Sequence, residues 1–167
     1  DVYKRQDLYN VRSFGFRGEA LPSIAAVSNL EITSKAPNQE MAFLLSLSEG
    51  KITEFKPTSR TAGTTVTVSN LFCNLPARKK FLKTDRSEQN LIIKTIKRLA
   101  LSRPDVALSC DVLDSSGDRT VLNYVAVEPG DFSTRFGQVL GGEFMDNCFY
   151  FSVSKDGFKI EGHASIP

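Results

Sequence analysis

The first half of the chain contains short runs in which apolar and polar residues alternate, the pattern of β-strands with one buried face. The clearest run is residues 63–68, where threonine and valine alternate after a glycine. Three further runs predict strands at residues 30–34, 42–47 and 51–55. Glu49 and Gly50 mark a turn between the last two, and in the last run Ile52 and Phe55 alternate only roughly. These runs predict neighbouring antiparallel strands.

Helical periodicity appears before and after this group of strands. Residues 19–28 follow a pair of glycines and predict a short helix, in which Pro22 is tolerated only in the first turn. A longer helix is predicted from Asp85, because Asp85 and Glu88 have the spacing of a capping pair, and Pro104 ends its pattern. Its predicted apolar face consists of Ile92, Ile96, Leu99 and Ala100. We expect this face to pack and the lysine-rich side to be solvated.

The last part of the chain predicts two hairpins with a short helix between them. The hairpins are expected at residues 106–113 with 120–127, around a polar turn at 114–118, and around a turn at 155–157. Residues 132–140 predict the helix, which Gly141 and Gly142 are expected to end. Pro129 and Gly130 form the best candidate for a domain boundary.

Composition and charge narrow the class of protein. The 167 residues are 41% hydrophobic and 24% charged, which is typical of a globular protein and excludes a disordered tail, a collagen and a disulfide-dense miniature. The net charge of +2 hides a strong asymmetry. Residues 76–103 contain nine Lys and Arg against two Asp and Glu (9 − 2 = +7), whereas residues 104–167 contain four against ten (4 − 10 = −6). A basic block of this kind is typical either of an anionic partner or of a solvated face.

Cysteine usage and hydropathy predict the compartment. Cys73, Cys110 and Cys148 are odd in number, far apart and form no CxxC pair, which favours buried or inert thiols in a reducing compartment over a zinc site or disulfides. No apolar run approaches the ~18 residues of a membrane span, and there is no signal-peptide pattern. We therefore expect a cytoplasmic protein without a membrane partner.

The two ends of the sequence suggest a piece of a longer protein. Residues 1–6 (DVYKRQ) resemble the translation of a sequencing adapter and are excluded from the fold prediction. The chain stops at Pro167, directly after a predicted strand.

A glycine loop before the first helix is a candidate phosphate site. Gly15 and Gly18 are three residues apart and lead directly into the helix start, where backbone N–H groups and the helix dipole favour anions. A simple turn explains the same spacing, and the string matches neither a Walker A loop nor the dinucleotide fingerprint. Spacing alone leaves both interpretations open.

A compact basic cluster is a candidate nucleic-acid contact. Arg78, Lys79, Lys80 and Lys83 could neutralise several phosphates, with binding that weakens steeply as salt rises, or they could form a solvated helix face. The +7 block makes these two interpretations about equally weighted. His163 has no Ser or Cys partner that spacing identifies, so a triad is not predicted, and no metal-ligand spacing is present. The loop carboxylates Asp114 and Asp118 are expected to serve the turn.

Three strings together resemble the MutL family of DNA mismatch repair proteins. They are residues 13–25 (SFGFRGEALPSIA), 63–65 (GTT) and 70–82 (NLFCNLPARKKFL), in the family's order and spacing. The last string is specific, because it separates this family from the gyrase subunits, heat-shock chaperones and histidine kinases of the same ATPase superfamily. Asn70, where the family usually has Asp, and Cys73, where it often has an aromatic residue, are minor departures.

The resemblance implies an α/β (α+β sandwich) fold. Residues 7–128 would form the C-terminal part of a Bergerat-type ATPase domain of the GHKL superfamily, with helices over a mixed, mainly antiparallel sheet. Residues 129–167 would start a second α/β domain of the ribosomal S5 domain 2-like type, truncated at Pro167.

By the same resemblance, ATP-binding residues would be Gly15, Phe16, Arg17, Gly18 and Glu19 in the loop that closes over the phosphates, Ala20 and Leu21 at the helix start, and Thr64 at the floor of the nucleotide pocket. The DNA-binding residues would be Arg78, Lys79, Lys80 and Lys83. The cofactors implied are ATP and Mg²⁺. The partners implied are DNA, a second copy through the N-terminal region, a mismatch-recognition protein and a downstream nuclease or helicase.

One departure from the family concerns catalysis. Family members carry a catalytic Glu and a magnesium-binding Asn, then an adenine-recognising segment, upstream of the glycine loop, and the residues before Gly15 here do not contain them. We therefore expect the 167-residue chain alone not to hydrolyse ATP. In a bacterium the intact protein would associate with the nucleoid. The alternative function is a stand-alone DNA-binding or protein-interaction module that uses the basic stretch 78–98.

Overall fold

The computed structural model describes residues 18–114 and 117–165. The chain divides into two compact units, Asp1–Leu82 and Lys83–Pro167. Pro129 and Gly130 lie inside the second unit, and their role as a domain boundary remains a prediction.

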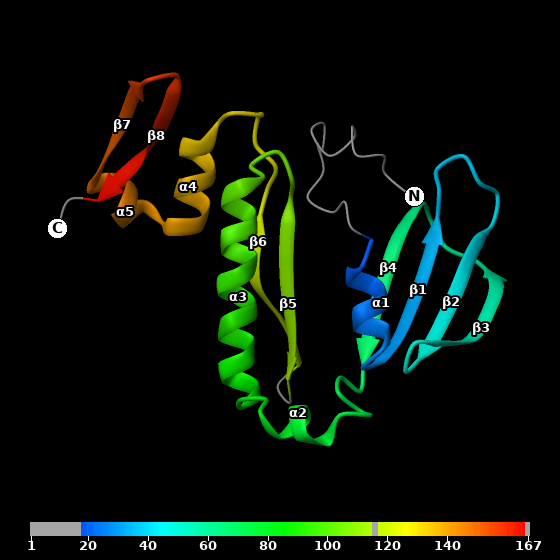
Figure 1. The fold of residues 1–167 in the computed structure, drawn as a ribbon. Helices are drawn as coiled ribbons and strands as arrows, with labels where there is room; N and C mark the ends of the chain where they lie inside the picture. Colours follow the sequence, from blue (N-terminus) through cyan, green and yellow to red (C-terminus); the bar gives the residue numbers. More distant parts are fainter. Residues whose placement is uncertain (1–17, 115–116, 166–167) are drawn as a thin grey trace. The chain divides into compact units, whose positions relative to one another are not determined.

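The first unit contains a four-stranded sheet and a short helix that contacts it (Figure 1). Its elements are α1 (Ala20–Ala25), β1 (Asn29–Lys35), β2 (Ala42–Ser48), β3 (Lys51–Thr58), β4 (Gly63–Ser69) and a second short helix, α2 (Pro76–Lys80). The strand order is β3-β2-β1-β4, and every pairing is antiparallel. The four predicted strands and the short helix are therefore confirmed, and the helix is shorter than the predicted 19–28.

One face of this sheet is apolar. Leu30 of β1 lies opposite Leu47 of β2 and Val68 of β4, and the neighbours of Ile32 continue the same face. Leu30 and Ala25 of α1 are buried, whereas Val68 keeps 44% of its surface exposed. Much of the apolar face therefore remains open in the part of the chain that the structure describes.

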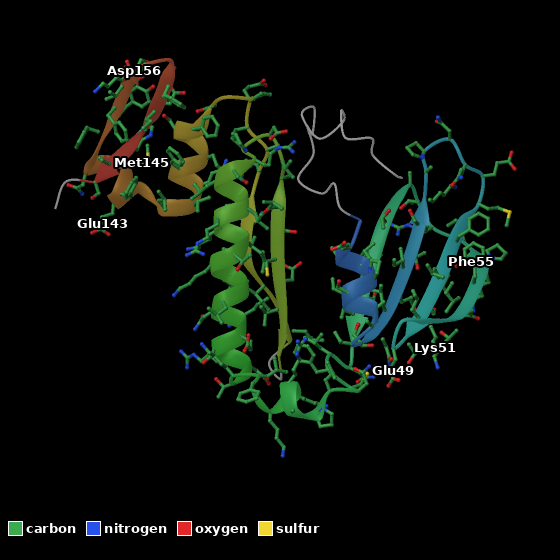
Figure 2. The ribbon with its side chains drawn as sticks, in the orientation of Figure 1. Glu49, Lys51, Phe55, Glu143, Met145 and Asp156 are labelled. Carbon is green, nitrogen blue, oxygen red and sulfur yellow. The ribbon has the colours of Figure 1, made fainter. Side chains whose placement is uncertain are left out.

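A β-bulge in β3 explains the rough alternation seen in its sequence. Thr53 has no partner in the register of β2 with β3, which shifts at that point. Because one extra residue is inserted there, Ile52 and Phe55 face the same side although they are three residues apart. Phe55 (Figure 2) stacks on Phe43 of β2, with the ring centroids 5.4 Å apart and the planes inclined by 9°.

Two hairpins close through two-residue turns with positive φ at both central residues. The φ angles are 51° at Glu49 and 78° at Gly50 in the first turn, and 50° at Asp156 and 81° at Gly157 in the second. These angles belong to the type I′ turn, whose twist matches that of the flanking strands. Glu49 and Asp156 are labelled at the two tips in Figure 2. Both turns lie where the sequence predicts them.

The second unit contains three helices and two separate antiparallel hairpins. Its elements are α3 (Asp85–Ser102), β5 (Leu108–Asp114), β6 (Gly117–Tyr124), α4 (Phe132–Leu140), α5 (Gly142–Asp146), β7 (Cys148–Lys155) and β8 (Phe158–Ser165). Gly141 ends α4 with a φ of 90°, as predicted, but Gly142 opens α5 instead of ending a helix. Within the described residues, no helix is long and apolar enough to cross a membrane.

The core of the second unit joins α3, α4 and β6. Its buried residues are Ala100, Leu122, Tyr124 and Val139, and Ile93 and Ile96 pack against them. The predicted face of α3 is therefore partly wrong: Ile96 and Ala100 face the core, but Ile92 and Leu99 are 55% and 54% exposed. Ile93, Ile96 and Ala100 form an equally regular helical stripe, because isoleucine occupies both positions 92 and 93.

The N-terminus of α3 is capped one residue earlier than the sequence predicts. The Thr84 side chain accepts a hydrogen bond from the Ser87 N–H at 3.4 Å, and the Glu88 carboxylate accepts one from the Lys83 N–H at 2.9 Å. Asp85, the predicted cap, is the first residue of the helix itself. The Glu88 carboxylate thus reaches back to the main chain before the cap, and the Thr84 hydroxyl adds to the bond that the Ser87 N–H makes with the Thr84 carbonyl at 2.8 Å.

We expect Thr84→Ala to lower the free energy of unfolding by about 1 kcal/mol, the usual cost of losing a side-chain N-cap. Asp85→Ala should cost less, because Asp85 makes only a favourable interaction with the helix dipole. Urea unfolding followed by circular dichroism measures both, with Thr84→Ser as the variant that keeps the hydroxyl. A larger loss for Asp85→Ala than for Thr84→Ala would contradict the assignment of Thr84 as the cap.

A buried arginine joins α4 to the segment between α3 and β5. Arg135 is fully buried, and its Nη2 donates to the carbonyl oxygens of Pro104 and Val106, each at 2.6 Å. Its guanidinium carbon lies 5.9 Å from the centroid of the Tyr124 ring. Burial raises the pKa of Tyr124, and the nearby Arg135 charge opposes that rise. Arg135 therefore holds α4 against the end of α3 through main-chain carbonyls.

The cysteines differ from the prediction in one respect. All three are free thiols, as expected, but Cys73 is exposed, and Cys110 and Cys148 are half-buried. Cys73, which lies in the turn after β4, is therefore not buried, and an inert thiol remains the prediction for it. Cysteine number and spacing argue against a disulfide framework or a zinc site, but they do not report the exposure of a loop residue.

Candidate functional site

The predicted phosphate loop lies at the start of the described chain. Gly15, Phe16 and Arg17 lie outside the described residues. Gly18 has a φ of 66°, in the left-handed region that favours glycine, and α1 begins two residues later at Ala20. The structure thus confirms that a glycine in a left-handed conformation leads into a helix. It does not test phosphate binding.

Thr64 lies near the start of β4, directly opposite Ser34 of β1. Their hydroxyl oxygens are 2.8 Å apart and form a hydrogen bond. Both residues line an open hollow of about 620 Å³ at this end of the sheet, together with Gly63 and Phe43. The hollow thus combines two hydroxyl groups with an aromatic side chain, which suits a ligand that has both polar and flat apolar parts.

Ser34 was not predicted as a site residue. Its sequence neighbours indicate only a strand, and no motif marks the serine. The signal that identifies it is the register of β1 with β4, which places Ser34 beside Thr64. Because this register joins residues 30 positions apart, it emerges only from the structure.

Arg60 supports the same pair of strands from the opposite face of the sheet. Its Nη1 donates to the carbonyl oxygen of Thr33 and, at 3.1 Å, to the Thr65 hydroxyl, while Nε donates to the Thr61 carbonyl at 3.0 Å. Thr33 and Thr65 are the sequence neighbours of the hydroxyl pair and are register partners. Arg60 therefore fixes the backbone that presents Ser34 and Thr64 to the hollow.

The predicted DNA-binding cations divide between a short helix and the start of the second unit. Arg78, Lys79 and Lys80 lie in the last turn of α2 (Pro76–Lys80) and are exposed, and Lys83 is the first residue of the second unit. Among the side chains that the structure describes, none of the four has an ion-pair partner. All four cations are therefore available to an anion. Arg78, Lys79 and Lys80 also lie at a helix C-terminus, which is electrostatically favourable for positive charge.

The single histidine has a serine neighbour that sequence spacing did not reveal. His163 Nε2 lies 3.4 Å from Ser133 Oγ, and the ring packs edge-on against Phe136. The other ring nitrogen, Nδ1, has no hydrogen-bond partner among the described residues. Since no carboxylate within residues 18–114 and 117–165 is seen to orient the ring, the pair lacks the third member of a triad there.

Metal binding is not indicated in the part of the chain that the structure describes. No group of three or more His, Cys, Asp or Glu residues within residues 18–114 and 117–165 could hold a metal ion.

Comparison with known proteins identifies relatives over almost the whole chain. The DNA mismatch repair protein MutL of Rhodopseudomonas palustris strain BisB18 is 40% identical over 164 residues, which is 97% of this chain and 27% of that protein. The MutL protein of Nitrobacter hamburgensis is also 40% identical, over 97% of this chain and 26% of its own length. The chain thus spans about a quarter of these curated relatives. No family model matches the chain.

Solved structures show the same fold. The crystal structure of the N-terminal domain of a DNA repair protein matches with a TM-score of 0.74 and 28% identity, over 96% of this chain and 51% of that one. The Aquifex aeolicus MutL ATPase domain complexed with ADP matches with a TM-score of 0.68 and 27% identity, over 90% of this chain and 56% of that one. The predicted α/β fold, with antiparallel sheets of the GHKL ATPase type, is confirmed. By sequence and by fold, this chain belongs to the MutL family of DNA mismatch repair proteins.

Proposed function

We propose that this chain is part of a MutL-type protein that binds and hydrolyses ATP, dimerises through its N-terminal region and couples mismatch recognition to downstream repair. The observation that carries the proposal is the match to an ATPase domain complexed with ADP over 90% of this chain. The fold and the glycine loop leading into α1 are consistent with that match. The intact protein's partners would be DNA, a mismatch-recognition protein and a repair nuclease or helicase, and its location would be cytoplasmic.

On the nucleotide side, two segments of the first unit would contact ATP. Gly15–Leu21 would close over the phosphates, because a glycine loop that leads into a helix presents backbone N–H groups to anions. Thr64 would line the floor of the pocket, where its hydroxyl is already oriented by Ser34. Arg60 would act as a positioning residue for this floor, since it touches only the neighbouring backbone and Thr65.

On the DNA side, Arg78, Lys79, Lys80 and Lys83 would contact backbone phosphates. Their exposure and their lack of described ion-pair partners support this role, as does the +7 charge of residues 76–103. Contacts of this type give affinity without reading sequence, so binding is expected to be strongly dependent on salt.

We expect the 167-residue chain alone to show no ATP turnover, because the catalytic base and the metal ligand of the family precede the glycine loop and residues 1–14 lack them. A chimaera in which this chain, from Asp7, replaces the matching quarter of a MutL relative should hydrolyse ATP at a rate comparable to that of the parent. Phosphate release under steady-state conditions measures both. ATP turnover by the isolated chain would contradict the proposal that the catalytic base and the metal ligand lie outside it.

The same chimaera tests the floor of the pocket. Thr64→Val should raise the KM for ATP about fivefold, the equivalent of one lost hydrogen bond. Thr67→Val is the matched control, because Thr67 lies on the same strand but alternates to the other face, opposite Glu31. Equal KM values for the two variants would remove Thr64 from the site. An inactive chimaera, combined with DNA binding by the isolated chain, would favour the stand-alone module.

A further inference from the structure

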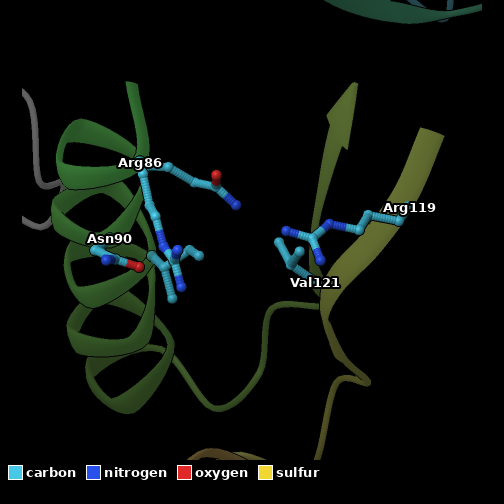
Figure 3. Close-up of a pocket in the computed structure, with 6 residues that line it drawn as sticks. Arg86, Asn90, Arg119 and Val121 are labelled. Atoms are coloured by element: carbon cyan, nitrogen blue, oxygen red, sulfur yellow. The ribbon is translucent and has the colours of Figure 1, made fainter. Parts of the chain in front are cut away.

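A hollow with two arginines lies between α3 and β6 in the second unit (Figure 3). It has a volume of about 540 Å³. Its lining consists of Arg86, Gln89, Asn90 and Ile93 from the first half of α3, and Arg119 and Val121 from β6. In Figure 3, Arg119 extends from β6 towards α3, and Arg86 lies along the side of the helix nearer β6. Neither the loop nor the basic cluster described above contributes to this hollow.

The lining has the chemistry of an anion site. Arg86 and Arg119 carry guanidinium groups, whose forked donors match the oxygens of a phosphate. Gln89 and Asn90 add carboxamide donors that have no hydrogen-bond partner among the described residues. No carboxylate is among the six residues that line the hollow. Ile93 and Val121 form an apolar floor beneath these polar groups.

The walls of the hollow are held in place by the core. Ile93 and Val121 both pack against the buried cluster that contains Ala100 and Leu122. The start of α3 is fixed by its cap, and β6 is fixed by the ladder with β5. The two arginines therefore project from elements whose separation is set by packing, which lowers the entropy lost when both bind one ligand.

We propose that this hollow holds one backbone phosphate of a bound nucleic acid. The inference rests on the proposed DNA binding and extends it beyond the basic cluster. A polymer is favoured over a small free anion because Arg86, Asn90 and Arg119 are exposed and the hollow is open to solvent. Lys83, one of the proposed DNA contacts, lies only three residues before Arg86 and belongs to the same unit. A polymer presents several phosphates, so it could engage Lys83 and the hollow at the same time.

Salt-dependent binding of duplex DNA to the 167-residue chain tests this proposal. We expect Arg86→Gln and Arg119→Gln each to lower the slope of log affinity against log salt by about 0.9, the contribution of one phosphate. Each variant should lose affinity by roughly tenfold. Because both arginines hold the same phosphate, the double variant should lower the slope no further than either single variant. Fluorescence anisotropy over a KCl series gives the slope and the affinity.

Lys94→Gln is the matched control, because it removes the same charge from α3 at a position outside the hollow. If Lys94→Gln and Arg86→Gln change the salt slope and the affinity equally, DNA is attracted by the overall positive charge of α3 and the proposal is wrong. If the double variant lowers the salt slope by the sum of the two single effects, the two arginines do not share one phosphate and the proposal is wrong. If Arg86→Gln weakens the binding of inorganic phosphate but leaves DNA binding unchanged, the hollow is a free-anion site and the proposal is wrong. Thermal unfolding establishes that each variant is folded.

The failures of this inference and of the proposed function are distinguishable. If charge reversal at Lys80 and Lys83 weakens DNA binding but the arginine variants do not, only the hollow is excluded. If the wild-type chain shows no salt-dependent DNA binding, the proposed DNA binding and the hollow both fail.

Discussion

Reversal of two charges, in the double variant Lys80→Glu with Lys83→Glu, is expected to reduce the affinity of this chain for duplex DNA by about 100-fold or more. Each lysine that neutralises one phosphate releases counterions and contributes about 0.9 to the salt slope, so losing both should lower the slope by about 1.8. The introduced glutamates add repulsion to the lost attraction. The two side chains have no described ion-pair partners, so little folding energy depends on them.

The control must change the net charge by the same amount elsewhere. Lys51→Glu with Lys155→Glu does so, because both lysines are exposed, one on β3 and one at the end of β7. Only a small loss of affinity is expected for this pair, from the change in the overall field. If both double variants lower the slope equally, the basic cluster has no special role, and binding follows net charge alone. Anisotropy titrations over a KCl series separate the two results.

The sequence predicts the elements well where local chemistry decides them. Two glycine-containing turns, at Gly50 and Gly157, have the positive φ angles that the type I′ turn requires. The threonine–valine alternation in 63–68 predicts β4 almost to the residue. In each case the determining interactions lie within a few residues of one another, so the sequence pattern contains them.

The predictions that fail depend on contacts between distant residues. On α3, adjacent isoleucines at 92 and 93 allow two apolar stripes, and packing against β6 and α4 selects the stripe with Ile93. Capping of the same helix depends on whether Thr84 or Asp85 adopts the extended backbone, which spacing alone does not decide. Both errors are small shifts of one residue, but each moves a different side chain into contact.

The candidate site shows the same division. Thr64 and the basic cluster are recognisable because family motifs contain them. Ser34 and Arg60 carry no motif, and they join the site only through the pairing of β1 with β4. No motif marks Arg119 either, and it lies 33 residues from Arg86 in the sequence. Only the packing of β6 near α3 places both arginines in one hollow. Such residues contribute to a site although no sequence motif contains them, so only the structure identifies them.

The largest effect on stability is expected from Ala100→Asp. Ala100 is fully buried on α3, at the centre of the cluster with Leu122, Tyr124 and Val139. A carboxylate at this position would be buried without a partner, and an uncompensated buried charge costs about 3–5 kcal/mol. Since small domains have only about 5–15 kcal/mol of stability, most of it would be lost at neutral pH. Urea unfolding followed by circular dichroism measures the loss.

Two comparisons separate burial of charge from a general effect of aspartate in a helix. Thr95→Asp introduces the same group on the exposed side of α3 and should cost less than about 1 kcal/mol. Burial raises the pKa of the introduced carboxyl above its unfolded value, so the folded state binds more protons than the unfolded state. The loss of stability from Ala100→Asp should therefore shrink as the pH falls from neutral towards about 4, whereas the loss from Thr95→Asp should not.

Because this core sets the separation of α3 and β6, Ala100→Asp should also abolish any shared effect of Arg86 and Arg119 on DNA binding at neutral pH. A variant that is unstable yet retains their coupling would show that the hollow does not depend on the core.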